Sequence, residues 1–558
     1  FAVIFNGEIY NHAELRRELE IEGCHFASDH SDTEVLLHAY AKWGAKLQDR
    51  LNGMWAFVIY DAEKKQLFGS RDRFGKKPFY YFQSGDTFAF ASELSALLEH
   101  PNCPRSISTI GLQKFFAYSL IPAPHSIIEG VHKLPAGHCF HFDLQSRNLK
   151  LQSWWEYRLE PDEALANRSA DFLAEELRER LQTAVSRRLI ADVPLGVFLS
   201  GGIDSTGVTA LAARIRPAAE VSTFSIGFDE ASFDESSYAQ AAAESIGTKH
   251  HCEKLKLADS CKLLPTLLQN IDEPQGDNSL LPTWLLCRSA RKHVTVALGG
   301  DGGDELLAGY DPFKALSPAR KYQSVIPKNI HPALRGLANF FPVSHRNMSL
   351  DFKVKRMLRG LSYSAPCWLP AWMGALEPKE INDYFGSSLS SEELYSEAIA
   401  AWNSESATND IDRASQYFIK VYLQDGILAK VDRASMLNSL EVRAPFLDIE
   451  LVDFIRKLPP HLKYRNGSGK YLLRSALREV VPDFVLERKK KGFGSPVGAW
   501  FRQGLQSENT DKNNSFAVKR QAAHRSGKKD ERLFLWAQYA LDEWKTGHKQ
   551  ALKLSDSK

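Results

Sequence analysis

The stretch DVPLGVFLSGGIDS, Asp192–Ser205, indicates the fold of the larger part of this chain. Its apolar run Val193–Leu199 predicts a buried strand, and Ser205–Arg214 has the apolar spacing of a helix. The two glycines between them allow backbone N–H groups to approach an anion closely, and the start of the helix adds its dipole and free N–H groups. Ser200 and Ser205 add hydroxyl donors. The stretch therefore predicts a pyrophosphate-binding loop; the alternative is a glycine-rich strand–helix turn without a ligand.

Strands and helices alternate on both sides of this loop. The pattern predicts helices at Ala170–Arg188, Ser205–Arg214, Ser236–Ile246 and Thr283–Lys292, and strands at Val193–Leu199, Val221–Phe228 and His293–Leu298. Alternation at this spacing predicts βαβ units and a parallel sheet. After Tyr310 the sequence predicts mostly helix, with polar loops at Ser387–Ser391 and Ser507–Asp530.

The chain before the linker has a different pattern. It predicts helices at His12–Glu20 and Asp32–Trp43, and short strands at Trp55–Tyr60, Gln66–Ser70, Pro78–Phe82 and Thr87–Ala91. Short, turn-bounded strands rich in aromatic residues indicate an antiparallel sheet. The polar segment Trp154–Ala170 is the candidate linker, so we expect domains at 1–155 and 170–558.

Composition excludes several classes of protein. The chain has 558 residues, of which 44% are apolar and 25% charged, the balance of an ordinary globular protein. With 70 Lys and Arg against 68 Asp and Glu, no strong field of one sign exists to bind nucleic acid or an anionic membrane. No apolar run approaches the ~20 residues of a membrane span. The 7 cysteines are scattered without a CxxC pair, which predicts a cytoplasmic protein without structural disulfides.

A second glycine-rich loop, GGDGGDE at Gly299–Glu305, follows the last predicted strand. Asp301, Asp304 and Glu305 offer the hard oxygen ligands that Mg²⁺ takes together with substrate phosphates. Because both loops end strands of one predicted sheet, we expect Asp204 and Asp304 to share one Mg²⁺–pyrophosphate. The alternative is a solvated acidic turn.

Strings along nearly the whole chain, in order, resemble the asparagine synthetase family. Those of the second half are DVPLGVFLSGGIDS (Asp192–Ser205), FSIGFDE (Phe224–Glu230), DEPQGDNSLLPT (Asp272–Thr283), GGDGGDELLAGY (Gly299–Tyr310), KVDRASMLNSLEVRAPFLD (Lys430–Asp448) and KKGFGSPVGAWF (Lys490–Phe501). FNGEIYNHAELRREL (Phe5–Leu19), SDTEVLLHAY (Ser31–Tyr40) and LNGMWAFVIYD (Leu51–Asp61) resemble its glutaminase half. The resemblance implies an α+β and α/β chain: an incomplete Ntn-type glutaminase αββα sandwich, then an α/β ATP-pyrophosphatase domain with a parallel sheet and a helical C-terminal region.

The resemblance implies ATP and Mg²⁺ as ligands of the second half. It places ATP or pyrophosphate at Leu199, Ser200, Gly201, Gly202, Asp204, Ser205, Ile226, Gly299 and Gly300. It makes Asp204 and Asp304 the metal carboxylates, and Asp301 matches an acidic residue that acts near the reacting carbonyl. Relatives often have Ser where this chain has Gly299, which leaves one adenine- or ribose-side hydrogen bond unassigned.

Two basic segments near the end of the chain indicate a function less specifically than the glycine-rich loops do. Gly469–Arg474 matches the family's GKxLLR string, so Lys470 resembles the lysine that contacts phosphate and steadies charge on the acyl intermediate. Without that match Lys470 reads as a surface lysine, and no GxxxxGKS or GxxxxGKT loop occurs in the chain. The run Arg488–Lys491 fits a solvated face and a cover for the triphosphate equally well.

The first half carries candidate glutamine-binding residues. Asn6 and Gly7 can donate to an oxyanion, and Asp32 can hold the α-ammonium of glutamine. The alternatives are a hairpin turn at Asn6–Gly7 and a helix cap at Asp32 or Ser31. Family members use an N-terminal cysteine as glutaminase nucleophile. No residue of this chain matches it, since Cys24 is expected to be a buried apolar residue, so we expect an N-terminally truncated chain.

The resemblance implies ATP-dependent synthesis of asparagine from aspartate through β-aspartyl-AMP, releasing AMP and pyrophosphate. Glutamine supplies the nitrogen in the family, and ammonia in a chain without the nucleophile. The alternatives are an amidotransferase that adenylates another carboxylate, as in surface-polysaccharide enzymes or β-lactam synthetases, and a non-catalytic or tRNA-binding relative. We expect no nucleic-acid or membrane partner; the oligomeric state stays open, a homodimer included.

Overall fold

The chain starts with an antiparallel sheet, called here the first sheet, in the order β1-β2-β3-β7-β8. Its strands are β1 (Ala2–Ile9), β2 (Gly53–Asp61), β3 (Gln66–Arg71), β7 (His138–Asp143) and β8 (Leu149–Ser153). A smaller antiparallel sheet in the order β5-β4-β6 contains β4 (Tyr80–Ser84), β5 (Thr87–Ala91) and β6 (Val131–Lys133). The computed structural model describes residues 1–230, 232–338, 340–344, 349–488, 492, 494–508 and 514–553.

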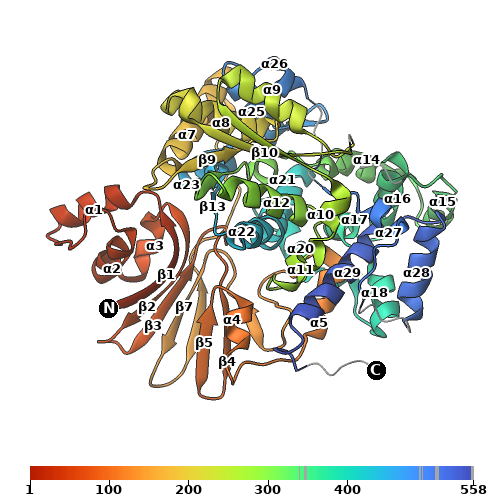
Figure 1. The fold of residues 1–558 in the computed structure, drawn as a ribbon, viewed down its shortest axis with the longest axis horizontal. Coiled ribbons are helices and arrows are strands. Elements are labelled where there is room, and N and C mark those ends of the chain that lie inside the picture. Colours follow the sequence, from red (N-terminus) through yellow and green to blue (C-terminus); the bar gives the residue numbers. More distant parts are fainter. Residues whose placement is uncertain are drawn as a thin grey trace.

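Both faces of the first sheet carry buried apolar residues, because side chains alternate between the two faces along each strand. On one face Phe57 and Ile59 pack with α1 (His12–Ile21) and α2 (Asp32–Trp43). On the other face Val58 and Phe140 pack with aromatic residues of the smaller sheet, whose β4 and β5 contact α4 (Leu94–Leu98). This order of helix, sheet, sheet and helix is the predicted αββα sandwich (Figure 1).

The parallel sheet has the order β11-β10-β9-β12-β13, and each neighbouring pair is parallel. Its strands are β9 (Leu195–Phe198), β10 (Ser222–Phe228), β11 (Lys249–Leu255), β12 (Val296–Leu298) and β13 (Glu441–Arg443). From β9 the chain moves outward to β10 and β11, then returns to the other side of β9 at β12. The strand order therefore reverses between β9 and β12, where open α/β sheets bind their ligands.

Helices cover the parallel sheet and form the C-terminal region. The helices not yet named begin in chain order with α3 (Leu47–Arg50), α5 (Thr109–Tyr118), α6 (Glu163–Ala166), α7 (Ala170–Arg188), α8 (Ile203–Ile215), α9 (Ser236–Ile246), α10 (Leu257–Cys261), α11 (Leu264–Gln269), α12 (Leu280–Arg291) and α13 (Gly303–Leu306). Next come α14 (Asp311–Val325), α15 (His331–Ala338), α16 (Leu350–Gly360), α17 (Trp368–Met373), α18 (Pro378–Phe385), α19 (Ser391–Leu394), α20 (Ser396–Trp402), α21 (Asp410–Tyr417), a π-helix (Phe418–Leu428) and α22 (Ala429–Met436). The last are α23 (Ile449–Lys457), α24 (Pro460–Lys463), α25 (Tyr471–Leu477), α26 (Asp483–Glu487), α27 (Val497–Arg502), α28 (Ser515–Arg525) and α29 (Arg532–Gly547), with the short hairpin β14 (Tyr464–Arg465) and β15 (Ser468–Gly469).

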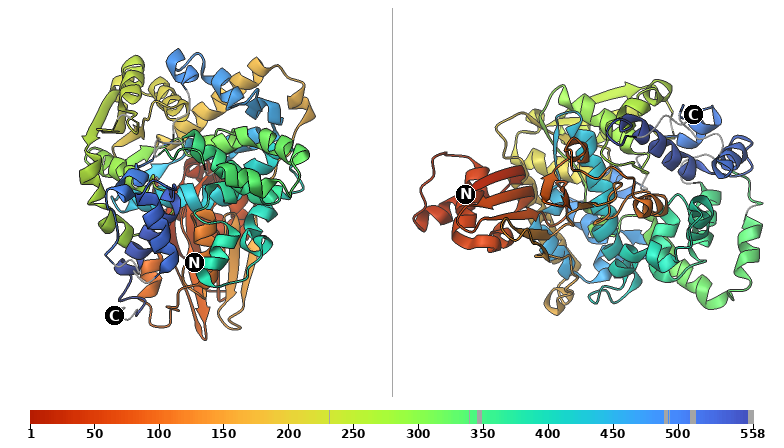
Figure 2. Two further views of the ribbon diagram at one scale, coloured as in Figure 1. Left: turned by 90° about the vertical axis from the view of Figure 1, so that its right-hand side faces the viewer. Right: turned by 90° about the horizontal axis from the view of Figure 1, so that it is seen from below.

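A large hydrophobic core joins segments that are far apart in the sequence. It contains Phe82 and Phe116 from the region of the smaller sheet together with Trp368 and Trp544 from the C-terminal helices. Helix α29 contacts both α5 and α11. The right-hand view of Figure 2 places the first strands and helices at one end of the molecule and the C-terminal helices at the other.

The structure corrects several local predictions. β1 continues through Ile9, so Asn6 and Gly7 lie inside a strand and not at a hairpin turn. β11 was not predicted, because its sequence KHHCEKL is polar and belongs to the edge of the sheet. Helix α28 lies within the segment Ser507–Asp530 predicted as a loop; its N-cap Asn514 accepts backbone N–H bonds and Ala517 is buried.

The predicted linker is ordered around a short helix. Between β8 and α7 the chain forms α6, and Tyr157 and Leu159 are buried in the core under α7. Ser169 caps α7 by accepting the N–H of Phe172 at 3.2 Å. The segment is therefore packed against the second half.

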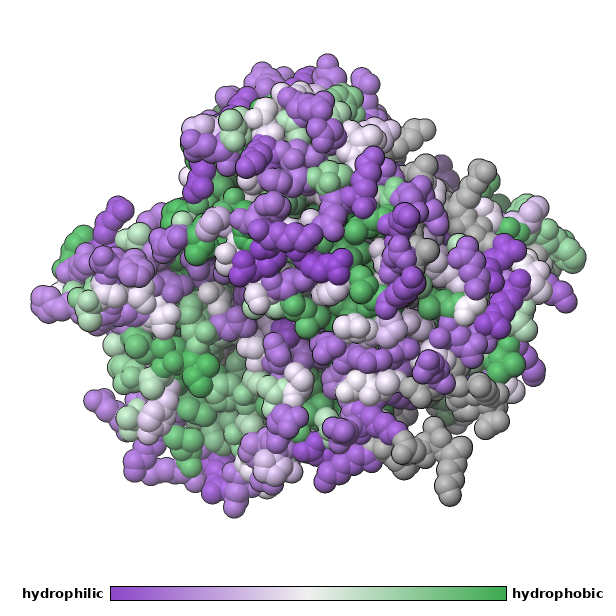
Figure 3. Space-filling model, viewed as in Figure 1, coloured by the Kyte–Doolittle hydropathy of each residue, from purple (hydrophilic) through white to green (hydrophobic). Residues whose placement is uncertain are grey.

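The surface mixes charged and apolar residues (Figure 3). An apolar area lies at the lower left, over the strands of the first sheet. On β1, Ile4 is 68% exposed. Among the helices of the described residues, none has both the length and the apolar character to cross a membrane.

Candidate active site between β9 and β12

The loops after β9 and β12 meet at the point where the strand order reverses. The loop after β9 contains Ser200–Ser205, and the loop after β12 contains Gly299–Glu305. β9 and β12 are hydrogen-bonded neighbours, with Leu195 paired to Val296 and Val197 to Leu298. This pairing brings together residues about a hundred positions apart, as expected; we call the assembly the β9–β12 site.

The loop after β9 is tightly wound and held by its own serines. Ser205 Oγ accepts the N–H of Ser200 at 3.1 Å and lies 3.0 Å from Ser200 Oγ, which also accepts the N–H of Gly202 at 3.3 Å. Gly201 has a φ of 70°, and a Cβ there would lie 2.6 Å from the Tyr238 backbone. α8 then begins at Ile203 with Gly202 as N-cap. The result is the predicted glycine turn at a helix N-terminus, which suits an anion.

The two loops interlock through glycines that touch Asp204. A Cβ on Gly300 would lie 3.0 Å from the Asp204 Cβ, and one on Gly303 would lie 2.9 Å from Asp204 Oδ1. The space around Gly309 is similarly small, because a Cβ added there would lie 2.1 Å from Asp304 Oδ1. These close approaches explain why the second loop is rich in glycine.

Lys470 lies between the two predicted metal carboxylates. Its Nζ contacts Asp204 Oδ2 and lies 2.5 Å from Asp304 Oδ1. The residue has a φ of 58°, precedes α25 and donates its N–H to Leu307 O at 2.8 Å, so its backbone is fixed from both sides. Burial disfavours its charge, but Asp204 and Asp304 outweigh burial and raise the pKa of Lys470. The structure thus brings Lys470 to the glycine loops.

The donor set fits a hard cation bound with a phosphate. Asp204 and Asp304 converge on one point, and the lysine found there shows that this point attracts positive charge. Among the described residues no group of three or more His, Cys, Asp and Glu side chains is arranged to hold a metal ion. Two carboxylates suffice for Mg²⁺ when substrate phosphates complete its coordination.

The second loop carries two further acids with different surroundings. Asp301 Oδ2 lies 3.9 Å from Nζ of Lys76, which comes from the loop after β3. Glu305 is buried and accepts the Tyr310 hydroxyl at 2.6 Å. Burial raises the pKa of Glu305 to about 7, with a contribution from Asp304.

The remaining predicted nucleotide residues line the same loops. Leu199 donates its N–H to Phe224 O at 2.9 Å, and Ile226 is a buried residue of the neighbouring strand β10. Gly299 donates its N–H to Arg443 O at 2.8 Å, and a Cβ there would lie 3.2 Å from Asp301 Oδ2. In this chain a Ser at position 299 would therefore crowd Asp301.

Only the first residue of the basic run Arg488–Lys491 is described; Lys489, Lys490 and Lys491 lie outside the described residues. Arg488 donates to Ser200 O at 3.0 Å and pairs with Glu235. Its guanidinium also lies 4.1 Å from the centre of the Tyr238 ring. Arg488 thus contacts the glycine loop itself and is not on a solvated face.

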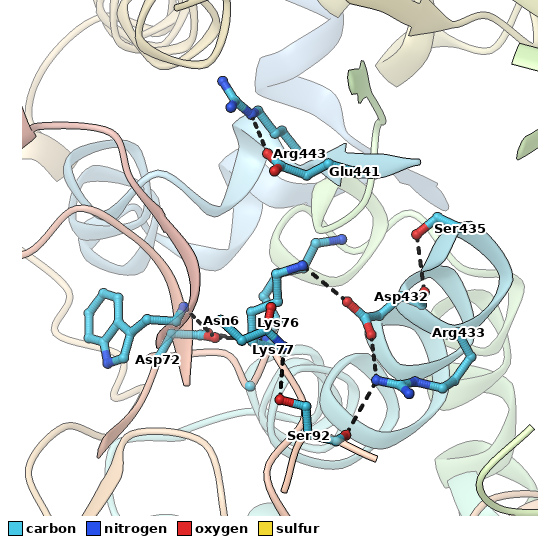
Figure 4. A network of polar contacts seen from close by, with 12 residues as sticks. Asn6, Asp72, Lys76, Lys77, Ser92, Asp432, Arg433, Ser435, Glu441 and Arg443 are labelled. Carbon is cyan, nitrogen blue, oxygen red and sulfur yellow. Dashed lines mark hydrogen bonds and ion pairs between the residues drawn. The ribbon is translucent and has the colours of Figure 1, made fainter. Parts of the chain in front are cut away.

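Sequence reasoning missed several paired charged residues, among them Lys77, which joins the first half to the second. Lys77 Nζ lies 3.3 Å from Asp432, which also accepts Arg433 at 2.8 Å (Figure 4). Lys430 is buried and donates to Asp277 at 2.7 Å. The strings that matched the family contain four of these residues, Lys430, Asp432, Arg433 and Asp277, and that match is the signal that would have pointed to them.

The predicted glutamine residues lie at β1 and the start of α2, which we call the β1 site. Asn6 Nδ2 donates to Ser92 Oγ at 3.0 Å, and a Cβ on Gly7 would lie 2.1 Å from Met54 O. Asp32 Oδ2 accepts the N–H of Ile9 at 3.2 Å. Ser31 is the N-cap of α2, because its side chain accepts the N–H of Glu34, so Asp32 is not the cap.

Cys24 is half-buried rather than fully buried and packs against the core under α1 and α2. The residues around Cys24 do not match those around the nucleophilic cysteine of the family. In the described structure it belongs to the packing of this end of the chain.

Comparison with known proteins agrees with both halves. A family model described as asparagine synthase matches residues 176–546, and one described as glutamine amidotransferase domain matches residues 1–155. A Bacillus subtilis protein named asparagine synthetase (glutamine-hydrolyzing) 1 is 33% identical over 506 residues, covering 90% of this chain and 77% of that protein. A Mycobacterium tuberculosis protein named putative asparagine synthetase (glutamine-hydrolyzing) is 33% identical over 90% of this chain and 76% of its own length. A Penicillium rubens protein named amidase chyE is 26% identical over 89% and 77%.

Proposed function

The chain belongs to the asparagine synthase family, and from that premise we propose that it makes asparagine from aspartate and ATP. The side-chain carboxylate of aspartate attacks the α-phosphorus of ATP, and the bond to pyrophosphate breaks to give β-aspartyl-AMP. Ammonia then attacks the activated carbonyl, the nitrogen loses a proton, and the bond to AMP breaks. The nitrogen comes from ammonia or from glutamine.

The observation that supports this proposal best is the convergence of Asp204, Asp304 and Lys470 on the glycine loop after β9. Their charges come from segments up to 266 residues apart. Burying such charges is costly unless they are paired, and a site of this kind is typical of catalysis on charged substrates.

Each group has a role in phosphoryl transfer. The N–H groups at Gly201 and Gly202 and the start of α8 are suited to the pyrophosphate, and Asp204 and Asp304 would hold the Mg²⁺. The metal would neutralise charge on the phosphates. Lys470 would stabilise the negative charge that develops on the phosphate and the acyl group.

The β1 site supports glutamine as nitrogen donor. Asn6 Nδ2 is a donor on the strand, and the Asp32 carboxylate lies beside the backbone of Ile9. We propose that Asn6 and Gly7 serve the oxyanion and Asp32 the α-ammonium. We also propose that the glutaminase domain comprises residues 1–155 and the synthetase domain residues 170–558.

Aspartate-stimulated exchange between ATP and labelled pyrophosphate tests the first half-reaction. The second is tested by the formation of asparagine and AMP with ammonium chloride. We expect exchange that requires both Mg²⁺ and aspartate. If a different carboxylate stimulates exchange and aspartate does not, the chain is instead an amidotransferase that adenylates that carboxylate. Release of ADP instead of AMP would contradict the proposal as a whole.

A further inference from the structure

The turn after β3 carries two buried lysines that point to different partners. The Asp72 carboxylate accepts the N–H groups of Phe74, Lys76 and Lys77 at 2.9–3.0 Å, which fixes the backbone of the turn. Arg71 strengthens it by donating to Lys77 O at 2.8 Å. Both lysines therefore leave a rigid support (Figure 4).

Lys77 and Lys76 differ in how their charges are satisfied. Lys77 Nζ lies 3.3 Å from a carboxylate oxygen of Asp432. Lys76 is 5% exposed, and among the described residues no acceptor lies within hydrogen-bond distance of its Nζ. The nearby carboxylate is Asp301, at 3.9 Å across the contact between the two halves. Burial lowers the pKa of Lys76, and Asp301 opposes that shift.

An ammonium group buried without hydrogen bonds is costly, and packing alone would be better served by an apolar side chain. The side chain of Asp301 lies in the loop of the β9–β12 site and is 20% exposed. In the described part of the chain Asp301 makes no other ion pair. Among the described residues, the cation that pairs with the Asp301 carboxylate thus comes from the first half.

We propose that Lys76 is a positioning residue for the second half-reaction, in which it holds the Asp301 carboxylate against the reacting carbonyl. This inference rests on the proposed function. When ammonia attacks the carbonyl, the nitrogen gains positive charge and must lose a proton. A carboxylate held at that point receives the proton, and the electron pair of the tetrahedral intermediate then expels AMP. Asp301 acts on the substrate, and Lys76 acts through Asp301.

The structure also shows how the turn is held in register with the β9–β12 site. Lys77 binds Asp432, and Asp432 binds Arg433 at 2.8 Å. Arg433 donates to Ser92 O at 3.5 Å, and Ser92 Oγ accepts Asn6 of the β1 site (Figure 4). Lys77 therefore anchors the turn to α22, whereas Lys76 reaches into the site.

The test compares Lys76→Met with Lys77→Met, two variants of one turn that each remove a buried ammonium. Two rates are measured for each: aspartate-stimulated ATP–pyrophosphate exchange, and asparagine formation with saturating ammonium. We expect Lys76→Met to keep exchange within about threefold of the parent while kcat for asparagine formation falls roughly tenfold or more, as when a proton acceptor is misplaced. The ratio of the two rates should stay at the parental value in Lys77→Met, because Asp72 still holds the backbone of the turn and Lys76 keeps its place.

Asp301→Asn completes a double-mutant cycle. If Lys76 acts through Asp301, Lys76→Met should add little to the loss already caused by Asp301→Asn. The inference would be overturned if the losses in the two single variants multiplied in the double variant. It would also be overturned if Lys76→Met left the ratio of the two rates unchanged, or if Lys77→Met changed that ratio as much as Lys76→Met. Should Lys76→Met fail to fold, Lys76→Gln gives the same comparison with a polar side chain.

The two proposals fail in different ways. A parent chain without aspartate-stimulated exchange contradicts the proposed function. A parent chain that exchanges and makes asparagine, with Lys76→Met indistinguishable from it in both rates, contradicts the role of Lys76 alone.

Discussion

At the β9–β12 site charged side chains meet one another, whereas at the β1 site polar side chains meet backbone groups or a single hydroxyl. Lys470 contacts both Asp204 and Asp304, and each carboxylate is enclosed by glycines. Asp32 accepts the N–H of Ile9 and the Thr33 hydroxyl, and Asn6 donates to Ser92. The first arrangement requires all its members, while the second lets each residue have a local structural role.

This difference determines how strongly a substitution at each site should affect the residues around it. Removing one charge from a buried cluster leaves the others uncompensated, so its members depend on one another. Removing one backbone contact has a small local effect. We therefore expect large and coupled effects at the β9–β12 site, and small and separable effects at the β1 site.

The largest effect is expected from Asp204→Asn and Asp304→Asn. Each removes a carboxylate from the Mg²⁺-phosphate, so aspartate-stimulated pyrophosphate exchange should fall by roughly a thousandfold or more. Asp311→Asn is the control, since its carboxylate pairs with Lys314 and Lys353 on the surface. Exchange at the parental rate in either site variant would mean that the β9–β12 cluster is structural.

Lys470→Ala should reduce kcat by roughly 10²–10³-fold while ATP binding changes little, because the lysine acts on charge that develops in the transition state. ATP affinity by calorimetry and kcat from AMP release separate the two quantities. Lys470→Arg keeps a cation between Asp204 and Asp304 and controls for loss of the fold. A rate within a few-fold of the parent would show that Lys470 only balances the carboxylates.

Glu8 allows a test by pH near the β1 site. Burial raises the pKa of Glu8 to about 7, opposed by Arg443 at 3.6 Å. Because the pKa of Glu8 in the folded chain lies above the ordinary glutamate value of 4.5, the native chain retains a proton that the unfolded chain loses. The free energy of unfolding should therefore fall as the pH rises from 4.5 through 7.

Glu8→Gln removes this dependence and should gain about 1–3 kcal/mol relative to the parent between pH 5 and pH 8. Urea unfolding of both chains at the two pH values measures the difference. Equal pH dependence in parent and variant would show that Glu8 is ionised throughout.

The smallest effect is expected from separating Ser31 and Asp32. Ser31→Ala removes the N-cap of α2 and should cost ~1 kcal/mol of stability without changing glutamine affinity. Asp32→Asn should weaken glutamine binding while its effect on the melting temperature stays below that of Ser31→Ala. If Asp32→Asn lowered the melting temperature more than Ser31→Ala and left glutamine binding unchanged, Asp32 would have a purely structural role.

Sequence patterns predicted those features that depend on neighbouring residues. The turn at Ser200–Ser205 is such a feature, because its glycines, serines and helix start are contiguous. The helix at Ala170–Arg188 was predicted with its observed bounds, and its cap Ser169 precedes it directly. The edge strand β11 and helix α28 were missed, because polar composition hides the few residues that tertiary packing buries.

The pairing of distant charges was the part that patterns could not supply. Lys470 was placed at the site through a resemblance, since a lone lysine before a helix carries no signal of its own. Lys76 was not singled out, because its partner Asp301 is far away in the sequence. Only the fold shows that the turn after β3 faces the loop after β12.

The shared core has a consequence for synthesis on the ribosome. Arg105, near the smaller sheet, donates to Ala551 O across a separation of 446 residues, and Trp544 donates to Asp272 O at 2.9 Å. At about 5–20 residues per second, the last helix emerges roughly 20–90 s after residue 105. During that interval the parts of α5 and α11 that pack against α29 have no permanent cover, so the nascent chain is a natural client for chaperones. A stop codon shortly before α29 would leave that surface exposed for the lifetime of the protein.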